Sequence, residues 1–219
     1  MPTPKERLNR LLELAAQGAS ERAALAGEVA DLLLDWPAPY PMSMRATFEA
    51  LLEKIVREMD LAGRAMLAPR FEDRDDFPLS LLNEFFLGAG DPMRAAILAR
   101  NDAMGAADAL PIDSDALLHA ARTAEDFSGA LARLAGLSEP LAAAIAGDGG
   151  ALAVLCKGAS IHRAAFSAIA ILAGPPRSVH ANFAMLAAYD DVPADGAAQL
   201  LAFWQARGET QILEAADAA

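Results

Sequence analysis

Residues 154–172 read VLCKGASIHRAAFSAIAIL, and this stretch shows how the whole chain is built. Two apolar segments, each too short to cross a membrane, flank a polar break at Gly158. Leu152, Leu155 and Cys156 follow the i, i+3, i+4 spacing that places side chains on one face of a helix. The stretch therefore predicts two short helices that pack together across a tight turn.

The rest of the chain repeats this helical pattern. Val, Ile and Thr together supply only 17 of the 219 residues, and no segment alternates apolar and polar side chains as a half-buried strand does. Apolar stripes at helical spacing recur near the N-terminus and beyond residue 43, where Ser43 is a candidate N-cap. These stripes are Leu8, Leu11, Leu12 and Ala15, and then Phe48, Leu51, Leu52, Ile55 and Met59. The sequence predicts an all-α protein.

Helix-breaking and helix-capping residues recur along the chain and divide it into about a dozen short helices. The segment DWPAPYP ends a helix at about Leu34, because each Pro removes a backbone donor and disfavours helix in the residue before it. Later helix starts are expected at Pro78 and Pro92 and after the caps Ser114 and Ser138. Short connectors and local contacts favour stacked helix pairs, an α-solenoid-like arrangement, over a compact bundle.

The expected organisation has two continuous sets of helix pairs and a tail. We expect N-terminal pairs over residues 1–110, C-terminal pairs over 111–208 and a frayed or marginally helical tail over 209–219.

Charge and composition narrow the class of partner. The formal charge of −12, with a pI near 4.6 and no basic stripe, argues against binding to nucleic acid. It favours a basic or mixed protein partner instead. A single cysteine fits a reducing compartment, and we find neither a signal-peptide pattern nor an apolar run long enough for a bilayer. We therefore expect a cytoplasmic protein without a membrane role.

Three segments resemble a known family. DFSGALARLAGLSEPLAAAIAGDGGALAVLCKGASIHRAAFSAIAIL (residues 126–172) has a Leu-rich GL turn, a short helix and an LA-x-LC-K helix. Residues 7–34 and 189–205 complete a pattern that is similar to a bacterial, chiefly alphaproteobacterial, family of HEAT-like helical-repeat proteins catalogued as a domain of unknown function. The likeness implies a HEAT-like fold and no particular activity. The DWPAPYP loop and the acidic FEDRDDFP turn depart from the family pattern.

Cys156 and His162 are the strongest candidates for a nucleophilic pair. A helix N-terminus beside a thiol lowers its pKa, but catalysis also needs a base within reach and a group that orients it. No Asp, Glu or Asn lies nearby in the sequence for that second role. The helical spacing places Cys156 on a buried stripe, so we interpret it as a core residue and assign no catalytic residues.

Metal and cofactor patterns are also incomplete. Glu72–Asp76 gathers four carboxylates, but Phe77 takes a ligand position of a calcium loop and Pro78 replaces its required Gly. We expect a solvated, helix-capping turn there. His119, His162 and His180 lack the spacing of a helical metal pair. No phosphate loop, nucleophile elbow or dinucleotide fingerprint is found, so no cofactor or metal is expected.

The loop DWPAPYPMSM has unusual character for a connector. It places Trp36, Tyr40, Met42 and Met44 in a Pro-stiffened segment, and aromatic and Met side chains are favoured at protein interfaces. The alternative is that Trp36 and Tyr40 fold back as a lid on the core of the first helix pair. Both interpretations stay open, and these four residues are the candidate partner-binding residues.

Two functions follow from these observations. The first is a non-enzymatic helical-repeat interaction module that binds a protein partner, in a bacterial regulatory assembly. The alternative is a small-molecule sensor or an enzyme whose pocket lies between helix pairs and draws on residues dispersed in the sequence.

Overall fold

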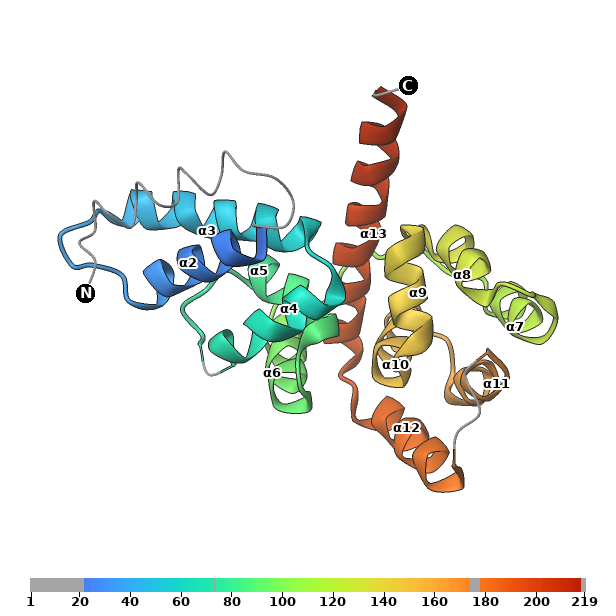
Figure 1. The fold of residues 1–219 in the computed structure, drawn as a ribbon. Helices are drawn as coiled ribbons and strands as arrows, with labels where there is room; N and C mark the ends of the chain where they lie inside the picture. The colour runs from blue at the N-terminus through green and yellow to red at the C-terminus, as the bar shows by residue number, and fades with distance from the viewer. Residues whose placement is uncertain (1–21, 73, 174–177, 218–219) are drawn as a thin grey trace. The chain divides into compact units, whose positions relative to one another are not determined.

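The computed structural model describes residues 22–72, 74–173 and 178–217, and helices make up about three quarters of them (Figure 1). Twelve α-helices and two short 3-10 helices follow one another over these ranges without a β-strand. The predicted all-α class is confirmed.

Backbone contacts divide the chain into two compact units, residues 1–94 (unit 1) and 95–219 (unit 2). The division falls within α6 (Asp91–Asp102), and the expected change from N-terminal to C-terminal helix pairs after residue 110 stays a prediction. The backbone of Leu110 and the side chain of Asp102 are bonded to residues of α13 (Ala194–Asp217), so this connector belongs with the C-terminal helices.

Unit 1 is built around aromatic rings. Phe71 lies 4.9 Å from Phe77 in an edge-on contact and stacks on Phe85 at 5.0 Å, and all three side chains are fully buried. Asp60 caps α4 by accepting a hydrogen bond from the Gly63 amide at 2.8 Å. Over the described residues, the elements of this unit before α6 are α2 (Arg22–Leu34), α3 (Met42–Glu58), α4 (Leu61–Leu67), η2 (Ala68–Phe71), α5 (Leu79–Phe85) and η3 (Phe86–Gly88).

A buried charged group joins three helices of unit 1. Glu84 of α5 is only 5% exposed, and its carboxylate oxygens lie 3.6 Å from Arg57 Nε and 3.5 Å from Arg64 Nη1. Arg64 Nη2 also donates to the Arg57 carbonyl at 2.9 Å. These ion pairs link α3, α4 and α5 around one buried carboxylate.

Unit 2 is organised around α10, whose apolar side chains are all buried. In this unit α10 packs against α12 and α13, successive helices from α7 to α12 pack on one another, and α7 also packs on α11 (Figure 1). The remaining elements are α7 (Ser114–Thr123), α8 (Phe127–Ala135), α9 (Glu139–Gly147), α10 (Gly149–Gly158), α11 (Arg163–Ala173) and α12 (Val179–Asp191).

Aspartate residues start three of these helices. Asp113, Asp126 and Asp148 each accept hydrogen bonds from backbone amides of the first turn. Asp113 therefore takes the capping role that the sequence assigned to Ser114. Ser138 is an N-cap as predicted, although it forms no side-chain capping bond.

One other boundary differs from the sequence expectation, while the end of α2 at Leu34 is as predicted. Ser43 lies inside α3, whose N-cap is Pro41, because a Pro in extended conformation starts the helix directly. The segment expected to be a frayed or marginally helical tail lies at the end of α13, which continues to Asp217.

Hydropathy identifies no single described helix that is long and apolar enough to cross a membrane. The helices α9 and α10 reach such a length only together, and the chain bends by 112° between them.

Candidate partner-binding surface

The loop between α2 and α3 is folded on itself by local hydrogen bonds. The Tyr40 amide donates to the Pro37 carbonyl at 2.9 Å, and Trp36 Nε1 donates to the Tyr40 carbonyl at 3.3 Å. Pro37 and Pro39 keep this segment from continuing α2. These hydrogen bonds therefore place the Trp36 side chain close to the start of α3.

Three aromatic rings meet at this point. The Trp36 ring lies 5.8 Å from Tyr40 in an edge-on arrangement and 6.1 Å from Phe48 of α3. Trp36, Tyr40 and Phe48 are each only half-buried. The fold thus brings Trp36 and Tyr40 together, as a lid would require, but leaves part of each ring open to solvent.

The two methionines lie on the first turn of α3. Met42 is 66% exposed and Met44 is 40% exposed. Because successive helical residues are about 100° apart, the two side chains leave the helix on different sides. Met44 shares a face with Phe48, four residues later, and so extends the Trp36 cluster. Met42, on the other side of the helix, is the more exposed of the two methionines.

We call Trp36, Tyr40, Met42, Met44 and Phe48 the 36–48 surface. Helical spacing alone assigns Phe48 to the core, so sequence reasoning misses its part in this surface. The sequence sign that Phe48 belongs to this surface is its spacing of four residues from Met44, which places both on one helix face. A surface of half-open aromatic rings and flexible thioethers suits an apolar protein partner, since such side chains adapt to a contact and carry much of its binding energy.

An ion-pair cluster in unit 1 anchors the same helix. Arg45 donates to Glu49 at 2.8 Å and to Asp76 at 2.5 Å, and Arg74 holds Asp76 with two further bonds. The hydrogen bonds from Arg74 and from Arg45 outweigh the opposing effect of burial and keep the pKa of Asp76 far below its usual range.

This cluster also engages Asp76, the last carboxylate of the acidic turn. Both Arg45 and Arg74 lie over the Phe77 ring, at 5.2 and 5.3 Å from its centroid. The Asp76 carboxylate is therefore engaged by guanidinium groups. Within the described ranges, no three His, Cys, Asp or Glu side chains are grouped so that they could hold a metal ion.

Cys156 lies in the core of unit 2, as its spacing predicts. Its side chain is fully buried in α10, and desolvation raises the pKa of the thiol to about 12. His162 Nδ1 accepts a hydrogen bond from the Ala165 amide at 3.1 Å at the start of α11. The imidazole thus serves as a helix cap, and the thiol lacks the exposure and low pKa that a nucleophile needs.

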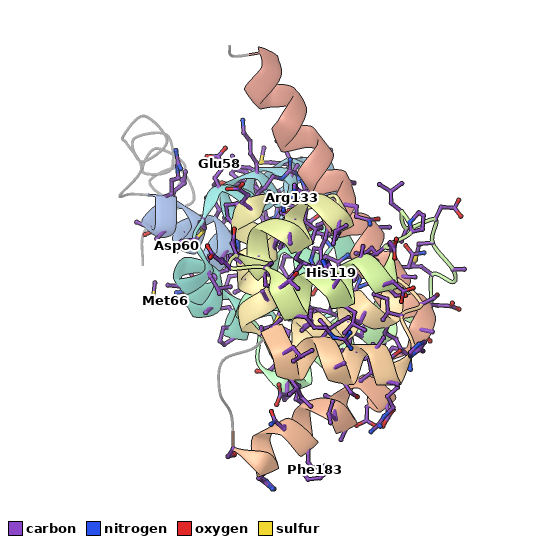
Figure 2. All side chains as sticks on the ribbon, turned by 90° about the vertical axis from the view of Figure 1, so that its right-hand side faces the viewer. Glu58, Asp60, Met66, His119, Arg133 and Phe183 are labelled. Carbon is purple, nitrogen blue, oxygen red and sulfur yellow. The ribbon has the colours of Figure 1, made fainter. Side chains whose placement is uncertain are left out.

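The other two histidines are exposed helix residues. His119 lies on α7 and His180 on α12. Figure 2 shows His119 on the outward side of α7 and Phe183, 69% exposed, pointing away from α12.

No family model, curated protein or solved structure matches the chain. The likeness to the HEAT-like family therefore stays a prediction that rests on its sequence motifs.

Proposed function

We propose that this protein is a non-enzymatic helical-repeat module that binds a protein partner through the 36–48 surface. The observation that carries the proposal is the exposure of Met42 and Met44 beside the half-open rings of Trp36 and Tyr40. Monomeric proteins seldom leave aromatic and Met side chains clustered at a surface without an interaction.

The helical arrangement supports the same function. Within unit 2 each helix from α7 to α11 packs on the next, as stacked pairs would, while α7 also packs on α11 and α10 on α13. In a HEAT-like arrangement, loops and helix starts along the edge would be available as binding elements. We propose a bacterial, cytoplasmic setting, in which a basic or mixed partner would complement the net charge of −12.

The contact itself would be mainly apolar. Arg45 and Glu49 next to the surface are already paired with each other, so their charges are largely neutralised locally. A partner segment that buries an apolar side chain against Trp36 and Met44 would displace water without leaving either charge unpaired.

Affinity capture tests the proposal. The tagged protein, a Met42→Asp, Met44→Asp variant and a Met66→Asp control are incubated with soluble lysate of the native host, and bound proteins are identified by mass spectrometry. Met66 is also in unit 1 and is 71% exposed, so it matches Met42 in residue type and accessibility (Figure 2). We expect one stoichiometric protein that the double variant loses and the control keeps.

A Trp36→Ala variant separates the partner site from the lid. If Trp36 serves binding, this change weakens capture and leaves the melting temperature nearly unaltered. A large fall in melting temperature would support the lid interpretation. Recovery of the same proteins by all variants would overturn the proposed site.

A further inference from the structure

A second surface feature lies in unit 2, far from the 36–48 surface in sequence. It is a groove of about 390 Å³, open to solvent, where the ends of α7, α9 and α11 meet the first turn of α8. This volume lies within the range of about 300–1,000 Å³ that small binding sites occupy in proteins.

The groove wall is made largely of short side chains. Ala121, Ala143 and Ala146 end at the β-carbon, so another chain can approach the helices closely. Leu172 lines the groove and is 49% exposed, and its neighbour Ile171 is 53% exposed. The exposed lining of the groove is more polar than apolar, and its apolar contacts come from these alanines and Leu172.

Carboxylates line one side of the groove. Glu125 and Asp126 both contribute to it, and none of its described lining residues is basic, although the charge of the nearby Arg133 of α8 acts on Asp126. Hydrogen bonds from the Ser128 hydroxyl and the Gly129 amide lower the pKa of Asp126, so it is ionised at neutral pH. Residues 95–219 carry 14 acidic and 7 basic side chains, so the wider surroundings are also negative.

These two properties together define an occupant. We propose that the groove binds a basic, partly apolar segment of another protein. An apolar side chain of that segment lies against the alanines and Leu172, and flanking Lys or Arg side chains pair with Glu125 and Asp126. The carboxylates disfavour anionic ligands such as nucleic acid by the same electrostatic argument. This inference does not depend on the 36–48 surface.

Peptide selection tests the groove without knowledge of the natural partner. A library of random peptides is displayed and selected on the full chain, and the enriched peptides are synthesised with a fluorescent label. Their dissociation constants are measured by fluorescence anisotropy for the wild type and for three variants. Ala143→Phe fills the groove from an exposed position, Glu125→Lys reverses the charge beside it, and Glu139→Lys makes the same reversal at an exposed residue that does not line it.

We expect enriched peptides in which Lys or Arg flank Leu, Ile or Met. Ala143→Phe should weaken their binding by about tenfold, equivalent to roughly 1.4 kcal/mol. Glu125→Lys should weaken it by about threefold to tenfold at low ionic strength and less at high ionic strength, with Glu139→Lys close to wild type. Thermal melts confirm that each variant is folded.

Three results would overturn the inference. The first is the absence of enriched peptides, and the second is a selected pool without basic residues. The third is equal binding by wild type, Ala143→Phe and Glu125→Lys. The Met42→Asp, Met44→Asp variant separates the two surfaces, because it should keep the selected peptides; their loss in that variant would assign them to the 36–48 surface instead.

Discussion

The side-chain amide of Gln205 is hydrogen-bonded to both backbone groups of Leu110. Its Oε1 accepts from the Leu110 amide at 2.7 Å, and its Nε2 donates to the Leu110 carbonyl at 3.1 Å and to the Ala135 carbonyl at 3.1 Å. Gln205 is 3% exposed. One side chain of α13 thus satisfies backbone groups of an irregular connector that no helix or strand pairs.

Replacement of Gln205 should therefore destabilise unit 2. Gln205→Leu leaves the buried Ala135 carbonyl and the partly buried backbone groups of Leu110 without this partner. A buried unsatisfied group costs roughly 1–3 kcal/mol, so we expect a loss of about 1–3 kcal/mol in the free energy of unfolding. Urea denaturation measures it. Gln199→Leu is the control, because Gln199 donates one bond, to Gly105 at 2.9 Å, and is half-buried. Equal losses in the two variants would contradict the bridging role of Gln205.

Local patterns predict the helices but not what joins them. The end of α2 follows from DWPAPYP, and the buried face of α10 follows from the spacing of Leu152, Leu155 and Cys156. The bridge from Gln205 to Leu110 spans 95 residues, and nothing in either local sequence marks it. The connector around Leu110 is joined to α13 by such long-range bonds, which local sequence patterns do not mark.

The candidate surface shows the same limit. The composition of the loop identifies Trp36 and Tyr40 as unusual, and the fold brings them together. Half-burial is a property of tertiary packing, so the sequence does not distinguish a full lid from an open cluster. Glu84 is a second case, because it lies in the apolar run SLLNEFFLG and its arginine partners come from two other helices.

Cys156 should behave as a small core residue. Cys156→Ser places a hydroxyl in an apolar site and should lower the free energy of unfolding by roughly 1–3 kcal/mol. The native thiol should react with a disulfide reagent only as the protein unfolds. An unchanged melting temperature in Cys156→Ser, together with rapid labelling of the native protein, would contradict the burial of this side chain.

Ionisation of the same thiol should make the free energy of unfolding decrease with rising pH in the alkaline range. Its pKa is raised from 9.0 to about 12 by burial, so the unfolded chain loses this proton at lower pH than the folded chain. The contribution of the buried, protonated thiol to the free energy of unfolding is complete below pH 9 and is lost as pH rises towards 12. Burial also raises the pKa of Tyr189, which acts in the same direction. Urea denaturation from about pH 8 to about pH 11 should show a shallower decline for Cys156→Ala than for wild type; identical slopes would contradict the prediction.

Ser160 occupies a left-handed backbone conformation with φ of 57° at the turn between α10 and α11. Non-glycine residues are disfavoured there, so Ser160→Gly should raise the free energy of unfolding by up to about 1 kcal/mol. Gly136 has φ of 66°, and a β-carbon added to it would have only Leu110 Cδ1 nearby, at 3.8 Å. Gly136→Ala should therefore cost about 1 kcal/mol through its backbone alone. Thermal melts that move in the same direction for both changes would contradict this account.

Gly158 lies where α10 approaches α13 closely. A β-carbon at this position would be 2.5 Å from the Ala197 carbonyl oxygen, which is a backbone atom and cannot turn aside. Gly158→Ala should lower the free energy of unfolding by about 1–3 kcal/mol through overpacking. Gly147, at the end of α9, has nothing within 4 Å of that position, so Gly147→Ala should be neutral or slightly stabilising. Equal effects of the two changes would argue against a close helix crossing.

The most direct test of partner binding is the rate of methionine oxidation by hydrogen peroxide, measured by mass spectrometry in the free protein and in the captured complex. Met66 and Met104, 71% and 68% exposed, are internal references for Met42 and Met44. Our account predicts slower oxidation of Met42 and Met44 in the complex and unchanged rates at both references. Unchanged rates at Met42 and Met44, or equal protection of all four, would contradict binding at the 36–48 surface.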